Sequence, residues 1–285
     1  MQRQDFRFFH RLRVRWAEVD MQKIVFNGHY LMYLDTAAGD YWRALALPYQ
    51  ATMAAFAGDL YVKKAQLEYH ASARYDDQLD IGMRCARIGT ASMVFAAGVF
   101  RGDTLLVGGE LVYVFADPAS QTSRPVPDAL RAALLGFEAG DAVTLLQTGD
   151  WATLRAAAAP LRQAVFVEEQ GVPADMEWDS DDHTALHAVS RNRLGDVVAT
   201  ARLLPAHDGV ARIGRMAVSP LLRGSGFGAE VLHALLQVAR QRGDRQVLLH
   251  AQRSAEAFYA RAGFVAHGEP FMEAGIPHIE MLRNL

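Results

Sequence analysis

The stretch Arg223-Gly-Ser-Gly-Phe-Gly228 decides the fold of the second half of the chain. It follows a run at residues 211–218 that is typical of a strand, and it precedes a run at 229–242 that predicts a helix. With a strand predicted at 246–252, this order gives a crossover unit whose two strands are parallel. The remaining elements predicted in this half are helices at 151–170 and 254–262, and strands at 187–191, 197–204 and 278–283.

A glycine-rich turn between a strand and a helix is a candidate phosphate site. Glycines let the backbone approach a ligand closely, the first helical amides have no partner inside the helix, and the helix dipole adds positive potential. Arg223 adds a positive charge beside them. A Walker A loop is excluded, because no Lys-Ser/Thr follows the glycines.

Two ligands remain for this turn. Gly224, Gly226 and Ala229 match a dinucleotide fingerprint loosely. The next strand, however, ends at His250-Ala-Gln252 and lacks the acidic residue that this fingerprint needs. The pyrophosphate of coenzyme A is the other candidate.

The motifs of this half resemble those of the GNAT acyltransferases. The glycine turn is similar to their pyrophosphate loop, and Arg212-Ile-Gly-Arg-Met-Ala-Val-Ser219 is similar to their central strand. Ala257-Phe-Tyr-Ala-Arg-Ala-Gly-Phe264 resembles their late helix. Further segments resemble the ElaA-like branch: Val165-Phe-Val-Glu-Glu-Gln170, the spaced acids after Pro173, Arg202-Leu-Leu-Pro205 and Gly275-Ile-Pro-His-Ile279. The resemblance covers about residues 145–285 and implies a mixed sheet flanked by helices that transfers acetyl from acetyl-CoA to an amine.

The resemblance also implies roles for single residues. Tyr259 would donate to the departing thiolate, since ordinary pKa values are about 10 for tyrosine and about 8.5 for a thiol; the alternative is a half-buried core tyrosine. Met216 and Val218 would offer backbone amides to the pantetheine and the thioester oxygen. The loop that binds coenzyme A would comprise Arg223, Gly224, Ser225, Gly226, Phe227 and Gly228. The candidates for a general base are His278, Glu273 and His187, although each also fits a structural role.

An acidic loop follows the first helix of this half. Its acids are Asp175, Glu177, Asp179, Asp181 and Asp182. Such a run could attract a cationic amine substrate. We favour the alternative of a solvated face whose carboxylates cap nearby helices, because charge runs usually have that role.

The first half of the chain has a different pattern. Apolar residues recur at helical spacing over residues 29–47, and Pro48 is expected to end that helix. A closing helix is predicted at 128–137, and strands are predicted at 11–16, 60–67, 79–88, 92–100 and 104–115. One long helix followed by antiparallel strands is an α+β arrangement in which the sheet wraps the helix.

Asp20 lies in a turn just before the long helix, where an aspartate is commonly a turn or cap residue. Its context gives another interpretation. The start of the chain resembles hotdog-fold acyl-CoA thioesterases of the 4-hydroxybenzoyl-CoA thioesterase type, over about residues 5–138. The segments that carry this resemblance are Arg13-Val-Arg-Trp-Ala-Glu-Val-Asp20, Ile24-Val-Phe-Asn27, Tyr30-Leu-Met-Tyr-Leu-Asp35, Tyr69-His-Ala-Ser-Ala-Arg-Tyr-Asp-Asp-Gln-Leu-Asp80 and Ser123-Arg-Pro-Val-Pro127.

This resemblance places the family's catalytic carboxylate on Asp20. A carboxylate can attack a thioester carbonyl or activate a water for that attack. The backbone N–H of Asn27, near the helix start, would stabilise the oxyanion. Many relatives have glycines just after the aspartate, so Lys23 could narrow the acyl pocket or face solvent. Cys85 lies in a strand pattern and is interpreted as a small core hydrophobe.

Composition bounds these hypotheses. The chain has 285 residues, 51% of them hydrophobic and 21% charged, which fits a globular protein of two domains; we predict domains 1–140 and 141–285. A net charge of -3 argues against a nucleic-acid binder. No apolar run suits a signal peptide or a membrane span, so a cytoplasmic location is expected. A single cysteine excludes an intrachain disulfide.

The preferred hypothesis is therefore a bifunctional enzyme of coenzyme A thioesters: an N-terminal hotdog thioesterase fused to a C-terminal GNAT acyltransferase. The alternative is that one half is a non-catalytic module that binds coenzyme A or oligomerises. Coenzyme A and acetyl-CoA enter as substrates, with a small amine or a protein amine as acceptor, and no metal is expected. The hotdog resemblance implies a homo-oligomer, and neither nucleic acid nor membrane is an expected partner.

Overall fold

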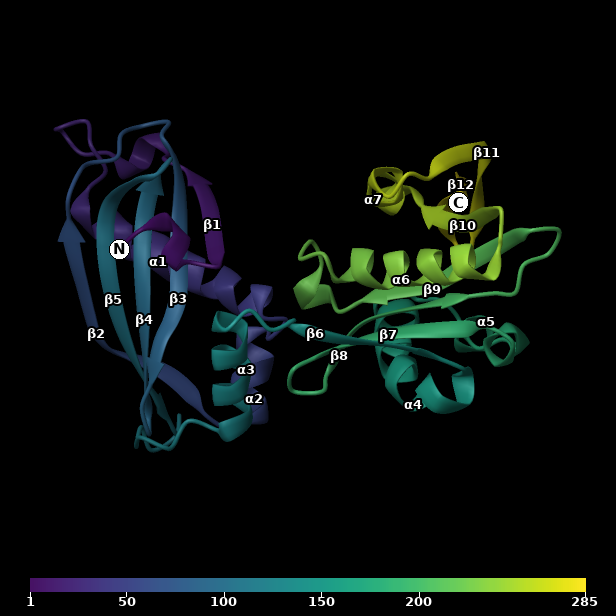
Figure 1. Ribbon diagram of the computed structural model, residues 1–285, viewed down its shortest axis with the longest axis horizontal. Helices are drawn as coiled ribbons and strands as arrows, with labels where there is room; N and C mark the ends of the chain where they lie inside the picture. The colour runs from purple at the N-terminus through teal and green to yellow at the C-terminus, as the bar shows by residue number, and fades with distance from the viewer. The chain divides into compact units, whose positions relative to one another are not determined.

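The computed structural model describes residues 1–285. The chain forms two compact units, Met1–Val143 and Thr144–Leu285, and both combine strands with helices (Figure 1). The last helix of the first unit is α3 (Asp128–Glu138), and the second unit begins with β6 (Thr144–Gly149). None of the helices combines the length and the apolar character that crossing a membrane requires.

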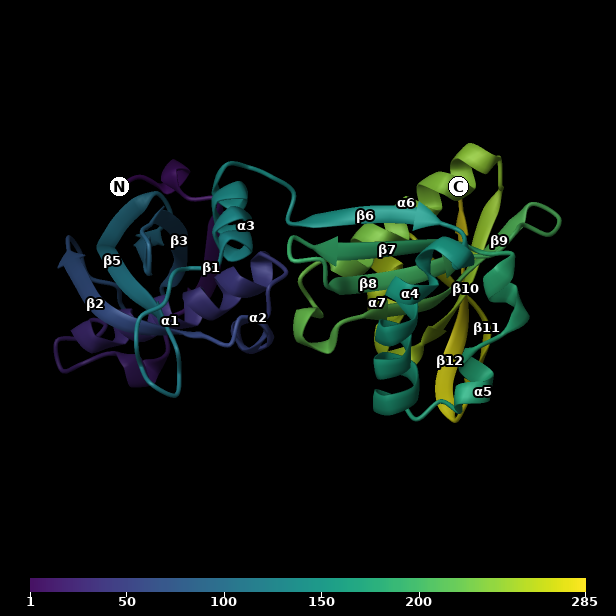
Figure 2. The ribbon, with the colours of Figure 1, turned by 90° about the horizontal axis from the view of Figure 1, so that it is seen from below.

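The first unit is an antiparallel sheet curved around one long helix. The five strands have the order β1-β3-β4-β5-β2. They are β1 (Phe8–Arg13), β2 (Asp59–Tyr69), β3 (Gln78–Ile88), β4 (Ser92–Arg101) and β5 (Thr104–Ala116). α1 (Asn27–Ala44) buries one apolar face against β1 and β3 on the inner side of the sheet (Figure 2). The α+β hotdog arrangement predicted for this half is therefore confirmed.

The end of the long helix differs from the prediction. α1 ends at Ala44 instead of residue 47, and Ala46 adopts a left-handed φ of 58° that cannot continue a helix. Pro48 is consequently not the residue that ends α1; it precedes a second helix, α2 (Tyr49–Ala55). Proline suits this place because the first turn of a helix needs no N–H donor.

The second unit is a mixed sheet of seven strands. Their order is β11-β12-β10-β9-β8-β7-β6. Besides β6, the strands are β7 (Leu186–Asn192), β8 (Val197–Leu203), β9 (Val210–Val218), β10 (Gln246–Gln252), β11 (Val265–Glu273) and β12 (Ile276–Asn284). β9 and β10 run parallel, which confirms the predicted crossover, and all other neighbours are antiparallel. The sequence did not reveal β6 and β11, because both are largely exposed and lack an apolar alternation.

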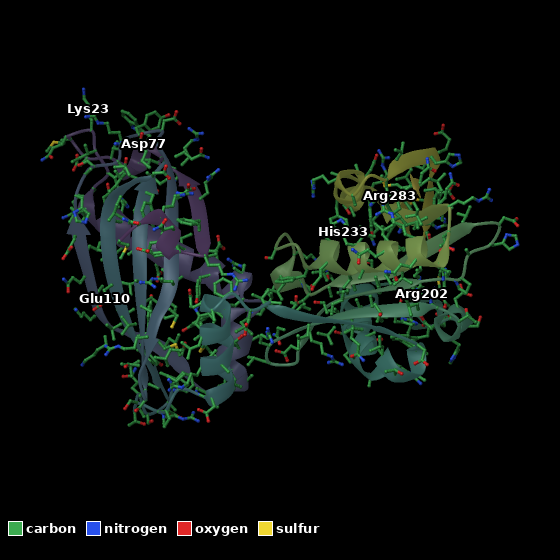
Figure 3. All side chains as sticks on the ribbon, in the orientation of Figure 1. Lys23, Asp77, Glu110, Arg202, His233 and Arg283 are labelled. Atoms are coloured by element: carbon green, nitrogen blue, oxygen red, sulfur yellow. The ribbon has the colours of Figure 1, made fainter.

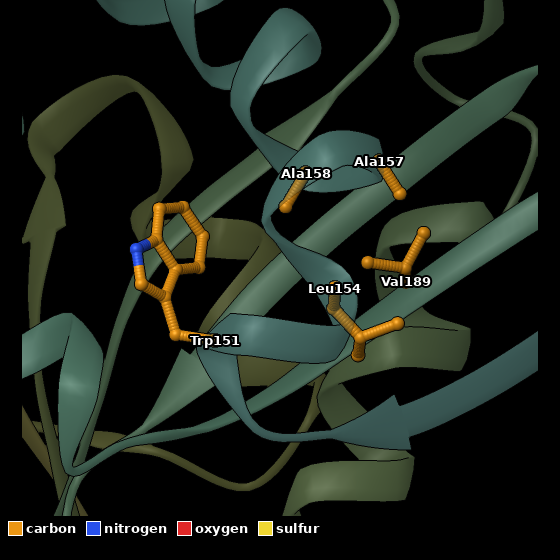
Figure 4. Packing of buried hydrophobic residues seen from close by; sticks show 5 residues of the cluster. All are labelled: Trp151, Leu154, Ala157, Ala158 and Val189. Carbon is orange, nitrogen blue, oxygen red and sulfur yellow. The ribbon is translucent and has the colours of Figure 1, made fainter.

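Helices lie on both faces of this sheet (Figure 1). They are α4 (Trp151–Arg162), α5 (Ala174–Glu177), α6 (Phe227–Arg242) and α7 (Glu256–Arg261). Trp151, Leu154, Ala157 and Ala158 of α4 pack with Val189 of β7 in one buried cluster (Figure 4). The single helix predicted at 151–170 is instead α4 followed by a π-helical segment, Gln163–Glu169. Single π-turns inside α-helices are frequent at functional sites.

Candidate functional site

In the first unit, Asp20 and Asn27 line one cavity of about 430 Å³. Asn27 is the first residue of α1, and the turn that contains Asp20 lies just before it. The Oδ1 atom of Asp20 accepts a hydrogen bond of 2.8 Å from the backbone N–H of Gln22, which fixes the carboxylate in its turn. Lys23 has a left-handed φ of 62°, does not line the cavity and points away from the unit (Figure 3). Of its two predicted positions, Lys23 therefore takes the solvent-facing one.

The turn before Asp20 is held by a buried carboxylate. Glu18 accepts hydrogen bonds from the backbone N–H and the guanidinium of Arg15 and from the hydroxyl of Tyr33. Burial opposes its ionisation, but these hydrogen bonds outweigh burial and lower the pKa of Glu18. The hydrogen bonds to Glu18 hold the chain in a turn at Trp16–Glu18. The strand predicted at 11–16 therefore ends earlier, at Arg13.

The start of α1 is held from the other side by β2. The hydroxyl of Tyr69 donates a hydrogen bond of 3.1 Å to the carbonyl oxygen of Asn27. Tyr69, His70 and Ser72 line the same cavity as Asp20. The sequence singled out none of them, although all belong to the segment that resembled the thioesterases. His29, which lies in the first turn of α1, does not line this cavity.

Cys85, by contrast, is a core residue. Its side chain is buried in β3, and burial raises the pKa of its thiol to about 12. The thiol therefore stays protonated near neutral pH and is no nucleophile.

In the second unit, a cavity of about 670 Å³ gathers most of the predicted acetyl-CoA residues. Its lining includes Met216, Val218, Arg223, Gly224, Gly226, Phe227, Gly228 and Tyr259. Ser225 does not line it. The sequence missed several polar side chains of this cavity: Gln170, His233, Gln252, Ser254 and Arg261.

The backbone of β9 presents unpaired amides to this cavity. The N–H of Ser219 donates to the carbonyl of Val198 in β8. Because successive N–H groups alternate between the two edges of a strand, that of Val218 points to the opposite edge. Met216 lies in the irregular stretch between Ala217 and Gly214, and both Met216 and Val218 lie beyond Arg212, where the pairing of β9 with β10 ends.

The glycine turn has the backbone of an anion site. Gly224 and Gly226 have φ values of 83° and 94°, and Gly226 caps α6. A side chain at either position would be strained. The positive charge that the sequence places beside this turn is paired: Arg223 makes two hydrogen bonds of 2.6 Å to Glu169, which lower the pKa of that carboxyl. Helical amides, rather than an unpaired arginine, provide the positive potential here.

Tyr259 lies beside the separated strands. Its hydroxyl is 3.5 Å from the sulfur of Met216, and burial raises its pKa to about 12. This direction widens the gap between the pKa of the hydroxyl and that of a thiol, which is ordinarily about 8.5. A tyrosine that stays protonated can still stabilise a departing sulfur by donating a hydrogen bond.

The acidic loop is not a solvated face. Arg162 is buried with Glu177 and Asp182, and its guanidinium hydrogen-bonds to both carboxylates. Arg202 pairs with Asp179 and Asp182. The favoured interpretation is therefore wrong for these three acids; Asp175 and Asp181 alone are exposed. The loop holds a buried ion-pair network, which leaves little negative charge to attract an amine.

This network also anchors Arg215, a residue of β9 with a left-handed φ of 48°. Its guanidinium donates to the carbonyl of Met176 and pairs with Glu177. The strained residue directly precedes Met216, which lines the cavity. The acidic loop therefore shapes the part of β9 that borders the cavity.

The three candidate bases have different surroundings. His187 is buried against Trp151 and contacts the carbonyl of Asp182, and burial lowers its pKa, which fits a neutral structural role. His278 contacts the carbonyl of Ile276 two residues earlier. Glu273 pairs with His250, which the sequence did not single out.

Known proteins similar to this chain fall into two groups. The acetyltransferase (GNAT) domain model matches residues 156–285, and the thioesterase superfamily model matches residues 22–108. The "uncharacterized N-acetyltransferase YjcF" of Bacillus subtilis is 33% identical over 125 residues, which are 44% of this chain and 88% of that protein. The crystal structure of Escherichia coli ElaA is 33% identical with a TM-score of 0.45, and the match covers 49% of this chain and 99% of ElaA. A 1,4-dihydroxy-2-naphthoyl-CoA thioesterase from Synechocystis is 16% identical with a TM-score of 0.42, over 45% of this chain and 95% of the other.

Proposed function

Because the chain belongs to the GNAT acetyltransferase family and also carries a thioesterase-superfamily domain, we propose that it is a bifunctional enzyme of coenzyme A thioesters. In this proposal the first unit hydrolyses an acyl-CoA, and the second transfers acetyl from acetyl-CoA to an amine. One observation carries it: each unit has a cavity that gathers the residues such chemistry requires.

In the first unit, Asp20 supplies the carboxylate. It attacks the thioester carbonyl or takes a proton from the attacking water. The N-terminal amides of α1 face the charge that develops on the carbonyl oxygen, and the Tyr69 hydrogen bond holds Asn27 in place. Loss of one oxyanion donor typically costs about 3–4 kcal/mol of transition-state stabilisation. The position of α1 therefore matters as much as the identity of Asp20.

In the second unit, the backbone binds the thioester. The amides of Gly226, Phe227 and Gly228 at the start of α6 receive the pyrophosphate, and the free edge of β9 pairs with the pantetheine. Tyr259 donates a hydrogen bond to the sulfur as the carbon–sulfur bond breaks. The amine attacks the carbonyl carbon of the same thioester.

We extend the proposal to a homo-oligomer that forms through the first unit. The cavity of Asp20 is lined by half-exposed aromatic side chains, with Phe26 and Tyr69 each 52% exposed. β2 is an edge strand whose residues are mostly exposed. A second copy that covers this edge would exclude water from the site. Light scattering on the full chain tests this step, and a strictly monomeric mass contradicts it.

Thiol release from a panel of acyl-CoAs, first without and then with amines, tests the proposed function. The proposal expects release without an amine for at least one acyl-CoA, and additional release from acetyl-CoA when an accepted amine is present. If only one of the two activities appears in a well-folded chain, the other half is instead a non-catalytic module, and the bifunctional proposal fails.

A further inference from the structure

A histidine and a glutamate lie where β9 and β10 separate. The parallel pairing of these strands ends at Leu248, two residues before His250. Gln252, two residues later on the same face of β10, lines the acetyl-CoA cavity. Side chains at i and i+2 share one face of a strand about 7 Å apart. His250 does not itself line the cavity, but it is the next side chain along the same face of β10 from Gln252, which does.

Glu273 orients this histidine. Its Oε2 atom is 2.9 Å from Nδ1 of His250. Burial opposes ionisation of Glu273, but the hydrogen bond from His250 and the nearby charges outweigh it and lower the pKa of Glu273. A neutral imidazole that donates from Nδ1 to a carboxylate has its lone pair on Nε2. A base that is oriented by a third group in this way is the usual arrangement for proton abstraction.

The other neighbours of His250 come from three strands. Nη2 of Arg212 in β9 is also 3.0 Å from Nδ1. A guanidinium N–H can only donate, so this contact is no hydrogen bond while Nδ1 carries the proton that it donates to Glu273; the charge of Arg212 then favours ionised Glu273. The ring of Phe271 in β11 lies 4.8 Å away and limits access of water from that side. Glu280 in β12 is the register partner of His250, and its Oε2 atom is 3.9 Å from Nε2 of His250.

A row of side chains leads from His250 to solvent. Glu280 also pairs with His267, its register partner in β11, at 2.8 Å. The side chain of His267 is 64% exposed. His250, Glu280 and His267 thus form an imidazole–carboxylate–imidazole row across β10, β12 and β11. With a water molecule bridging the 3.9 Å between His250 and Glu280, such a row can pass a proton from the interior of the site to solvent.

We propose that His250, oriented by Glu273, is the general base that deprotonates the acceptor amine, and that Glu280 and His267 carry the proton to solvent. The proposal rests on the acetyl transfer proposed above. Nε2 takes a proton from the substrate ammonium, and the amine then forms a bond to the carbonyl carbon. The carbon–sulfur bond breaks, its electron pair leaves with the sulfur, and the second proton of the nitrogen ends on that sulfur, which leaves as the thiol. One proton is released overall.

The test compares His250→Gln and Glu273→Gln with the wild-type chain. His207→Gln is the matched control, because His207 is 94% exposed at the turn between β8 and β9. Two quantities are measured in the full chain: the dissociation constant for acetyl-CoA, and kcat/KM for an accepted amine between about pH 6 and about pH 9.

We expect His250→Gln to lower kcat/KM by about 100-fold near pH 7. The loss should shrink as the pH rises, because more of the amine is then already neutral, and added imidazole should restore part of the rate. Glu273→Gln should lower kcat/KM by a smaller factor than His250→Gln does. Neither variant should change the affinity for acetyl-CoA, and the control should match the wild type.

Two results overturn the proposal, and they are distinguishable. If the wild type transfers acetyl and His250→Gln has the same rate and pH profile, His250 is not the base, while the proposed function stands. If the wild type binds acetyl-CoA but transfers acetyl to no amine in the panel, the proposed acetyltransferase activity fails and this proposal fails with it. A uniform loss at every pH that imidazole does not restore, with weaker acetyl-CoA binding, indicates a structural role and also contradicts the proposal.

Discussion

The two cavities differ in the kind of atoms that do the proposed chemistry. In the first unit, the central group is one side chain, the carboxylate of Asp20, which a hydrogen-bonded turn holds in place. In the second unit, the central groups are backbone amides of β9 and of the start of α6. A site built from a side chain should be sensitive to its chemical identity. A site built from backbone should instead be sensitive to conformation, and substitutions in the two units can test this difference.

The largest effect is expected for Asp20→Asn. The amide keeps the shape of the carboxylate but can neither attack nor take a proton, so hydrolysis of acyl-CoA without an amine should fall by about 1,000-fold. Amine-dependent transfer should be unchanged. Thiol release measured under both conditions checks this expectation.

Asp35→Asn is the matched control, because Asp35 is exposed on α1 and does not line the cavity. It should retain full hydrolysis. A variant Asp20→Asn that hydrolyses acyl-CoA at the wild-type rate would show that this carboxylate is only a turn residue.

The next effect is that of Tyr259→Phe. The hydroxyl, whose pKa is raised to about 12, stays protonated at every working pH and stabilises the departing thiolate through a hydrogen bond. Removing a hydrogen bond to a charged group costs about 1.5–3 kcal/mol, so kcat for acetyl transfer should fall by roughly 10- to 100-fold. The affinity for acetyl-CoA and hydrolysis in the first unit should not change. If Tyr259→Phe transfers acetyl at the wild-type rate, Tyr259 has only a structural role in the core.

A smaller effect distinguishes conformation from side-chain chemistry in the glycine turn. Gly226 and Gly195 both have a φ of 94°, and an added Cβ would meet no atom within 4 Å at either position. Alanine at each should therefore cost a similar strain of about 1–2 kcal/mol. Only Gly226→Ala, which disturbs the start of α6, should also weaken coenzyme A binding, by about tenfold.

Calorimetric titration with coenzyme A, together with a thermal unfolding curve for each variant, checks this pair. If the Gly226→Ala and Gly195→Ala variants have equal melting temperatures and also equal affinities for coenzyme A, the turn is not the pyrophosphate site.

The smallest effect concerns the pH dependence of stability in the second unit. Burial holds the pKa of His187 below its usual value, so below about pH 6.5 the unfolded chain binds a proton that the folded chain does not. The free energy of unfolding should therefore fall as the pH drops below about 6.5, by at most about 1.4 kcal/mol per pH unit for one proton. His187→Gln should flatten this slope, whereas His207→Gln should leave it unchanged. The free energy of unfolding at each pH is measured by urea titration. The fluorescence of Trp151 and Trp178, which lie beside the buried network, monitors the transition.

The sequence predicted what local patterns determine. The long helix, the glycine turn and the parallel crossover each follow from periodicity or from backbone requirements within a short stretch. The thioesterase resemblance named Asp20 and Asn27 together, and both line one cavity because only a short segment separates them in the chain. The loop residues that line the second cavity could be named because the family motif spans a continuous segment.

Contacts between distant segments could not be predicted. The acidic loop was misinterpreted because its partners, Arg162 and Arg202, lie outside the charge run, which by itself does not show whether an acid is buried. His250 was missed because Glu273 and Glu280 come from β11 and β12, and exposed β11 gave no strand signal. The pairing of Arg223 with Glu169 could not be predicted, because nothing near Arg223 in the sequence indicates that partner.

The central claim is that one chain holds two separate sites for coenzyme A thioesters, and the number of ligands bound per chain tests it most directly. Titration calorimetry of the full-length protein with an acyl-CoA thioether, in which a methylene group prevents both hydrolysis and transfer, measures that number. The account predicts two molecules per chain, and a single one after Gly226→Arg, which places a long side chain in the glycine turn. A wild-type chain that binds one molecule or none would contradict it.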